Sequence, residues 1–149
     1  MKRNKKKLFF YIVITVAIMA FIFLQSALSA DQSMQQSNVI VKWLAALFHA
    51  DAESLSFLVR KCAHFLEYLV LGISLLLTVR ELFLLNLRKS GIIAFMIGVV
   101  YAITDELHQL LVNGRSGEIR DVLIDAGGVL VGVLITCLIC HLRNRKRSG

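Results

Sequence analysis

The chain has 149 residues, a 57% apolar composition and a mean hydropathy of +0.70. These values exclude an ordinary soluble domain and leave room for a single domain. The net charge of +7 could indicate nucleic-acid binding, but most of the 17 basic residues flank long apolar segments, as they do in membrane proteins. The sequence therefore predicts an integral membrane protein in contact with lipid and not with nucleic acid.

Four apolar segments are long enough to cross a bilayer as helices, since about 20 apolar residues suffice. They cover residues 8–28, 57–79, 90–112 and 121–142. Basic clusters at residues 2–7, 80–89 and 143–147 lie on one side of these segments. The positive-inside rule places that side in the cytoplasm. We therefore expect an all-α polytopic protein of the plasma membrane, with residues 1–149 as one domain and both termini cytoplasmic.

The first apolar segment allows a second interpretation. Basic residues, an apolar run and Ala27-Leu28-Ser29-Ala30 together also resemble a cleavable signal peptide. The apolar run is longer than is usual in signal peptides, so we favour a retained span. The topology of the remaining spans is the same in either case.

The longest connection, residues 31–56, carries apolar residues at helix-like spacing. They are Val39, Ile40, Trp43, Leu44, Leu47 and Phe48. This pattern predicts a short amphipathic helix lying on the outer leaflet, with Lys42 and Trp43 at the level of the headgroups. A loop packed over the helix ends is the alternative.

Carboxylates inside three of the spans lie at similar depths. At a rise of ~1.5 Å per residue, Glu67, Asp105 and Asp125 lie ~7.5–9 Å inward from the outer ends of their helices. A charge at mid-bilayer costs at least roughly 2.5–3.5 kcal/mol, so these side chains should share one polar chamber. They are our candidate catalytic acids or bases, because buried carboxylates at functional sites often have shifted pKa values.

Further polar residues lie on the same helical faces, because residues three or four apart share a face. They are Lys61, His64 and Tyr68 on the second span, Tyr101, His108 and Gln109 on the third, and Asp121 on the fourth. Gly128 and Gly132 on the fourth span form a small-xxx-small surface that permits close helix approach. Gln25, Ser26 and Ser29 at the end of the first span could complete the rim of the chamber.

The polar residues belong to motifs that are typical of one family. The motifs are Arg-Lys-Cys-Ala-His-Phe-Leu-Glu-Tyr at residues 60–68, Leu71-Gly72, Tyr-Ala-Ile-Thr-Asp-Glu-Leu-His-Gln at residues 101–109, Gly114-Arg115, and Asp-Val-Leu-Ile-Asp-Ala-Gly-Gly at residues 121–128. With them the chain resembles the VanZ-like family of bacterial membrane proteins, from about Phe9 to Cys140. Asn113 departs from the pattern, since many members have proline before Gly-Arg. The resemblance implies a cell-envelope role and a link to resistance to the glycopeptide teicoplanin, and it leaves the chemistry open.

Two imidazole–carboxylate pairs could hold a metal. His64 with Glu67, and Asp105 with His108, are each three residues apart. On facing helices, such pairs can hold a divalent metal, and the mixed ligands would suit zinc, manganese or iron. The alternative that we favour is a network of salt bridges within the membrane. A divalent metal is therefore a candidate cofactor, with His64, His108 and Glu106 as ligands or as relay residues.

A basic rim lies above the acids. It consists of Arg60, Lys61, Arg115 and Arg120. Guanidinium groups bind phosphate bidentately, so we expect Lys61, Arg115 and Arg120 to hold the phosphate of a membrane lipid or of a lipid-linked cell-wall intermediate. Pairing of these cations with Glu118, Asp121 and nearby phospholipid is the alternative.

The cysteines indicate no cofactor. Cys137-Leu138-Ile139-Cys140-His141 matches the C-x-x-C-H pattern of covalent haem attachment. The pattern falls at the predicted cytoplasmic end of a span, whereas haem is attached on the outer side. Cys62 has no partner on its own side of the membrane, so no disulfide framework is expected.

The sequence thus predicts a cell-envelope protein that binds an anionic lipid or lipid-linked glycan at the outer leaflet and, if it is an enzyme, modifies it. A non-enzymatic protein that shields wall precursors is the first alternative. A small proton-coupled transporter is the second, and the absence of charged residues from the inner halves of the spans disfavours it. The sequence leaves the oligomeric state open.

Overall fold

The computed structural model describes residues 3–49, 51–115 and 117–148. These residues form helices and no strands. The helices are α1 (Lys5–Ser26), α2 (Ala30–Phe48), α3 (Ala52–Phe83), α4 (Leu87–Gln109) and α5 (Ile119–Ser148). All except α2 are long and apolar enough to cross a membrane. The prediction of an all-α protein with four membrane-spanning helices is therefore confirmed.

Side-chain caps fix where two of the spanning helices begin. The side chain of Asn4 accepts a hydrogen bond from the Lys7 amide at 3.1 Å, and the side chain of Asn86 accepts one from the Lys89 amide at 2.9 Å. Each cap satisfies an amide that the first helical turn leaves unpaired, which stabilises a helix by about 1 kcal/mol. The Asn4 amide also donates to the Glu81 carboxylate at 2.9 Å, so the start of α1 is tied to the end of α3.

The α4–α5 connection begins earlier than the sequence predicts. α4 ends at Gln109, three residues before the predicted end of the third span at Val112, and turns follow from Leu110 to Gly114. Gly114 has a φ of 76°, which glycine adopts without the steric penalty of a side chain. Asn113 and Gly114 thus lie at the end of the turn and not at the end of the helix.

Close backbone contact makes α3 and α5 the most extensively packed helix pair. A Cβ atom at Gly128 would overlap the carbonyl oxygen of Phe65, and one at Gly132 would overlap that of Leu69. Small residues at such positions let helices approach until their backbones touch, as is common in membranes. α4 packs against both of these helices, and α1 packs mainly against α3.

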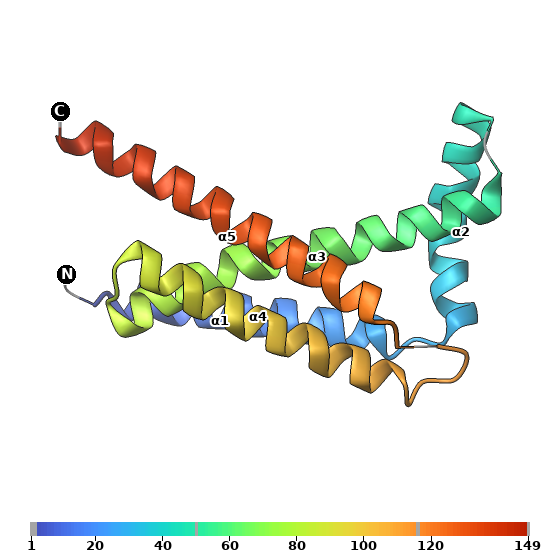
Figure 1. The fold of residues 1–149 in the computed structure, drawn as a ribbon, viewed down its shortest axis with the longest axis horizontal. Coiled ribbons are helices and arrows are strands. Elements are labelled where there is room, and N and C mark those ends of the chain that lie inside the picture. The colour runs from blue at the N-terminus through green and yellow to red at the C-terminus, as the bar shows by residue number, and fades with distance from the viewer. Residues whose placement is uncertain (1–2, 50, 116, 149) are drawn as a thin grey trace.

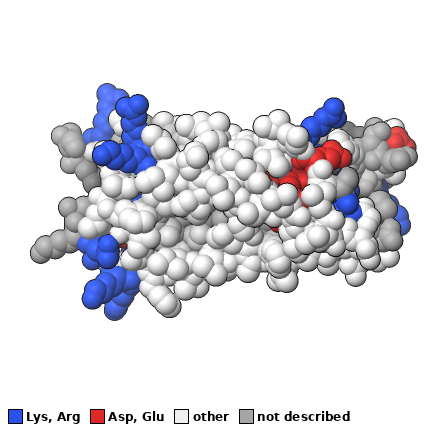
Figure 2. Space-filling model, turned by 60° about the horizontal axis from the view of Figure 1, so that its bottom comes forward, with Lys and Arg blue, Asp and Glu red and all other residues white. Residues whose placement is uncertain are grey.

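The two ends of the bundle differ in charge and in structure. Both chain termini lie at one end, which we call the terminal end, and α2 lies crosswise at the other, which we call the α2 end (Figure 1). Figure 2 shows Lys and Arg side chains gathered at the terminal end, an uncharged middle, and acidic side chains mostly toward the α2 end. The bundle therefore has the charge layout of a membrane-spanning protein.

The predicted helix within residues 31–56 is confirmed as α2, and the alternative of a loop is wrong. Ser29 and Gln32 form a capping box at its start. Trp43 is 66% exposed, and Val41 is buried. The side chains of Val39, Ile40 and Phe48, which belong to the predicted apolar pattern, lie outside the described residues.

Candidate functional site

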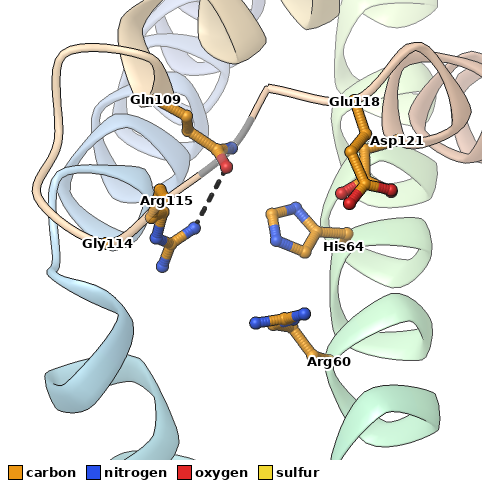
Figure 3. A pocket seen from close by; sticks show the side chains of 7 residues that line it. All are labelled: Arg60, His64, Gln109, Gly114, Arg115, Glu118 and Asp121. Atoms are coloured by element: carbon orange, nitrogen blue, oxygen red, sulfur yellow. Dashed lines mark hydrogen bonds between the residues drawn. The ribbon is translucent and has the colours of Figure 1, made fainter.

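A polar pocket of about 150 Å³ lies at the α2 end, between α3 and the α4–α5 connection (Figure 3). It is lined by Arg60, His64, Gln109, Gly114, Arg115, Glu118 and Asp121. α3 contributes Arg60 and His64, which are four residues apart and so share a helical face. The α4–α5 connection brings Gly114 and Arg115 opposite to them, because the left-handed Gly114 turns the chain back over the bundle.

Arg115 is held by three acceptors from other parts of the bundle. Its Nε donates to the Leu28 carbonyl oxygen at 2.9 Å, its Nη2 to the Gln25 carbonyl oxygen at 3.3 Å, and its Nη1 to Gln109 Oε1 at 3.2 Å. Burial, and next the neighbouring Arg60 guanidinium, lower the pKa of Arg115. Both effects disfavour the charged guanidinium, and a bound anion would offset them.

Arg60 lines the same pocket. Among the described residues, none accepts a hydrogen bond from its guanidinium or forms an ion pair with it. In Figure 3 the guanidinium groups of Arg60 and Arg115 lie near the His64 ring, and no carboxylate lies between them. Arg60 and Arg115 therefore share this pocket, which the acidic residues Glu118 and Asp121 also line.

The other two rim cations lie elsewhere. Lys61 forms an ion pair with Asp121, and both side chains are mostly buried. Arg120 is exposed and does not line the pocket. The alternative of internal pairing is therefore seen for Lys61, and of the three predicted phosphate-binding residues only Arg115 lines the pocket. Arg60, which the sequence placed in the rim but not among these three, lines it as well.

Buried carboxylates lie inward of the pocket. Asp105 is 3% exposed, Glu106 5% and Asp125 0%. The Gln109 side-chain amide donates to Asp105 at 3.3 Å, and the Glu118 backbone amide donates to Glu106 at 3.0 Å. Within the described part of the chain, the other oxygens of these carboxylates have no hydrogen-bond partner. Glu106 thus anchors the α4–α5 connection, and Asp105 and Asp125 keep free acceptors.

Asp105 lies near the other two carboxylates that the sequence places at its depth. This residue lies close enough to interact electrostatically with His64, Glu67, Tyr68 and Asp125. Three helices therefore deliver Glu67, Asp105 and Asp125 to one cluster. His64 connects this cluster to the pocket, because it lines the pocket and its Nδ1 lies 3.9 Å from Asp125 Oδ1.

Other predicted residues contact α1. The Tyr101 hydroxyl donates to the Met19 carbonyl oxygen at 2.6 Å. His108 Nδ1 lies 3.3 Å from Ser26 Oγ, and the His108 ring packs on Phe23 at 4.4 Å between centroids. His108 therefore lies at the α1–α4 contact and not in the lining of the pocket.

Tyr68 is fully buried, and its hydroxyl has no partner among the described residues. Its ring lies 6.2 Å from that of Tyr101. Among the described residues no three His, Cys, Asp or Glu side chains are grouped closely enough to hold a metal ion. The divalent metal stays a prediction.

Fold and site together define a small multi-pass helical membrane protein with a polar chamber at one end of its bundle. A family model described as VanZ/LLP1 matches residues 9–140. The chain therefore belongs to the VanZ-like family, and the resemblance carried by the sequence motifs is confirmed. Comparisons with curated proteins and with solved structures found no match.

Proposed function

We propose that the protein binds the phosphate of an anionic lipid or lipid-linked glycan in the polar pocket, at the outer leaflet of the bacterial cell membrane. The observation that carries this proposal is the pair of guanidinium groups, Arg60 and Arg115, that share the pocket with no carboxylate between them. Guanidinium groups match the geometry of phosphate oxygens and lose little hydration on binding.

The orientation follows from the basic clusters. In our proposal the terminal end faces the cytoplasm, because Lys and Arg next to membrane spans are retained there. The α2 end, with the pocket, then lies at the outer leaflet. There it would meet lipid headgroups and lipid-linked wall intermediates, which would connect the protein to teicoplanin susceptibility.

The size of the pocket limits what enters it. A water molecule occupies roughly 30 Å³ in the liquid, so a pocket of about 150 Å³ admits a group the size of a phosphate and not a whole glycan. The remainder of the ligand would therefore extend outward from the pocket. Gln109 and Gly114, which also line it, would lie beside the bound phosphate.

The buried carboxylates favour a catalytic version of this function. Asp125 does not line the pocket, but His64 lies between Asp125 and the pocket. His64 could therefore carry a proton between Asp125 and a ligand bound in the pocket. In this version Glu67, Asp105 or Asp125 is the final proton donor or acceptor. The non-enzymatic alternative, a protein that shields wall precursors, is favoured by one fact: none of these three carboxylates lines the pocket.

The experiment compares two arginines. Arg60→Gln removes a pocket cation that has no partner in the described part of the chain. Arg120→Gln removes an exposed arginine that does not line the pocket. Native mass spectrometry from nanodiscs containing phosphatidylglycerol and phosphatidylcholine would measure the anionic lipid retained. We expect Arg60→Gln to lower retention by about 10-fold, the effect of losing one charge-assisted hydrogen bond. Arg120→Gln should retain the lipid as the native protein does. Equal retention by all three proteins would contradict the proposal.

A second comparison separates binding from catalysis. Asp105→Asn and Asp125→Asn remove charge without changing size, and a charge reversal at Arg115 changes the pocket while sparing these acids. If the protein is an enzyme, the Asn variants abolish its effect on teicoplanin susceptibility at normal protein levels and leave lipid retention intact. If it only shields precursors, the Arg115 variant alone abolishes the effect.

A further inference from the structure

A second hollow lies inward of the polar pocket, between α1 and α3. It is an open groove of about 470 Å³. The groove is lined by Ile14, Ala17, Ile18, Phe21, Ile22, Leu66, Glu67 and Val70. Its walls are therefore apolar, and Leu66 is the lining residue nearest to the polar pocket along α3.

The groove and the pocket share α3, and Arg115 of the pocket also contacts α1. On α3, Arg60, His64 and Glu67 are four and three residues apart, a spacing that places them on one helical face. On α1, the Gln25 carbonyl oxygen accepts a hydrogen bond from Arg115 beside the pocket, and Phe21, one turn inward, lines the groove. The two hollows are thus neighbours along α3.

The length of the two hollows together matches one leaflet of a bilayer. At ~1.5 Å per residue, Val70 lies ~15 Å inward from Arg60 along α3. The hydrocarbon core of a bilayer is about 30 Å thick, so the pocket and groove together span about half of it. A lipid of one leaflet, with its headgroup in the pocket, could extend a chain along the whole groove.

We propose that the groove holds one hydrocarbon chain of the lipid whose phosphate occupies the polar pocket. The ligand is then a lipid with a phosphate headgroup and at least one long chain. The chemistry of the two hollows matches that molecule, because the pocket holds the cations and the groove beside it has apolar walls. This proposal rests on the proposed function, because the phosphate fixes where the chain begins.

The test uses two lipids with the same headgroup. Dihexanoyl phosphatidylglycerol has chains too short to fill the groove, and dioleoyl phosphatidylglycerol has chains that fill it. Retention of each by the detergent-solubilised protein would be measured by native mass spectrometry. We expect the native protein to prefer the long-chain lipid by at least about 10-fold, because the groove removes several methylene groups from contact with competing solvent and detergent.

Ala17→Phe fills the groove from α1, and Ala20→Phe places the same side chain on the same helix outside the groove lining. Both alanines are exposed at the surface of the bundle, so neither change should disturb the fold. We expect Ala17→Phe to abolish the long-chain preference while the short-chain lipid binds as before. Ala20→Phe should keep the preference.

Val70→Phe fills the groove from α3 and provides a second variant, since Val70 is 47% exposed. If the long-chain preference survives in both filled variants, the groove proposal is overturned, and the proposed function stands provided that Arg60→Gln still lowers retention of both lipids. If Arg60→Gln changes the retention of neither lipid, the proposed function itself fails. Equal loss of preference in Ala17→Phe and Ala20→Phe would also overturn the proposal, because ordinary contact with surrounding lipid would explain it.

Discussion

The two halves of the bundle differ in how completely their buried polar groups are hydrogen-bonded. In the half toward the terminal end, each buried hydroxyl has a partner: Thr15 and Thr78 are joined at 2.8 Å, and Thr136 donates to the Gly132 carbonyl oxygen at 2.8 Å. In the half toward the α2 end, several buried polar atoms have no hydrogen-bond partner among the described residues. They belong to His64, Tyr68, Asp105, Glu106 and Asp125.

In a membrane protein this difference in hydrogen bonding affects stability. An unpaired polar group in a low-dielectric interior costs a protein free energy of unfolding, and water is scarce there to satisfy it. The half toward the terminal end therefore has the composition expected of a structural element. The half toward the α2 end keeps groups that packing does not require, which is typical of a functional site.

The largest effect expected tests the ion pair between Lys61 and Asp121 at the α2 end. Lys61→Met leaves Asp121 without its partner, and both side chains are mostly buried. We expect the free energy of unfolding to fall by about 3 kcal/mol, as when one member of a buried ion pair is removed. Denaturant unfolding in detergent micelles would measure it.

The control for this change is the double variant Lys61→Met with Asp121→Leu. Replacing both members of the pair with apolar residues removes the orphaned charge, so most of the lost stability should return. If the double variant loses as much free energy of unfolding as the two single variants together, Lys61 and Asp121 do not stabilise each other. The α2 end would then lack a structural ion pair.

A smaller effect is expected where backbones touch. Gly128→Ala places a methyl group against the Phe65 carbonyl oxygen, whereas the neighbouring Gly127→Ala meets only the Phe65 ring, at 3.8 Å. We expect Gly128→Ala to lower the free energy of unfolding by about 2 kcal/mol, in the range measured for overpacked interiors. Gly127→Ala should change it little. Similar values for both variants in the same unfolding assay would argue against close α3–α5 packing.

The sign of the effect should reverse at the buried carboxylates. Asp125 is fully buried, and its two oxygens accept no hydrogen bond from the described residues. Asp125→Leu replaces it with an apolar side chain of similar size. We expect the free energy of unfolding to rise by about 1 kcal/mol, because an unsatisfied group is removed. The same variant should lose any proton-transfer activity. A variant that is clearly less stable than the native protein would show that Asp125 has a structural partner, and the contrast between the two halves would fail there.

Much of the fold could be predicted because membrane helices are governed by length and hydropathy. The depth of Glu67, Asp105 and Asp125 followed from counting residues along helices of known rise. The structure places these three carboxylates in one cluster. Span length, hydropathy and residue depth are properties of individual helices, so they can be read from one sequence.

The lining of the pocket was harder to predict because it depends on how helices are rotated against one another. Arg60 and Lys61 are adjacent in the sequence, but Arg60 lines the pocket and Lys61 pairs with Asp121. The acceptors that hold Arg115 include the backbone carbonyl oxygens of Gln25 and Leu28, and a backbone carbonyl leaves no trace in a sequence. Predicting the lining of the pocket would therefore have required knowing which distant segments of the chain contact one another.

The smallest effect concerns the hydroxyl pair in the half toward the terminal end. Thr15→Val and Thr78→Val each remove one side of the hydrogen bond that joins α1 to α3. A double-mutant cycle should give a coupling of about 0.6 kcal/mol, the average for hydrogen bonds between membrane helices. A coupling near zero would show that this half is held by packing alone. A coupling above about 2 kcal/mol, beyond the largest such value known for membrane helices, would show that polar contacts dominate in both halves, and the α2 end would then differ only in leaving its contacts incomplete.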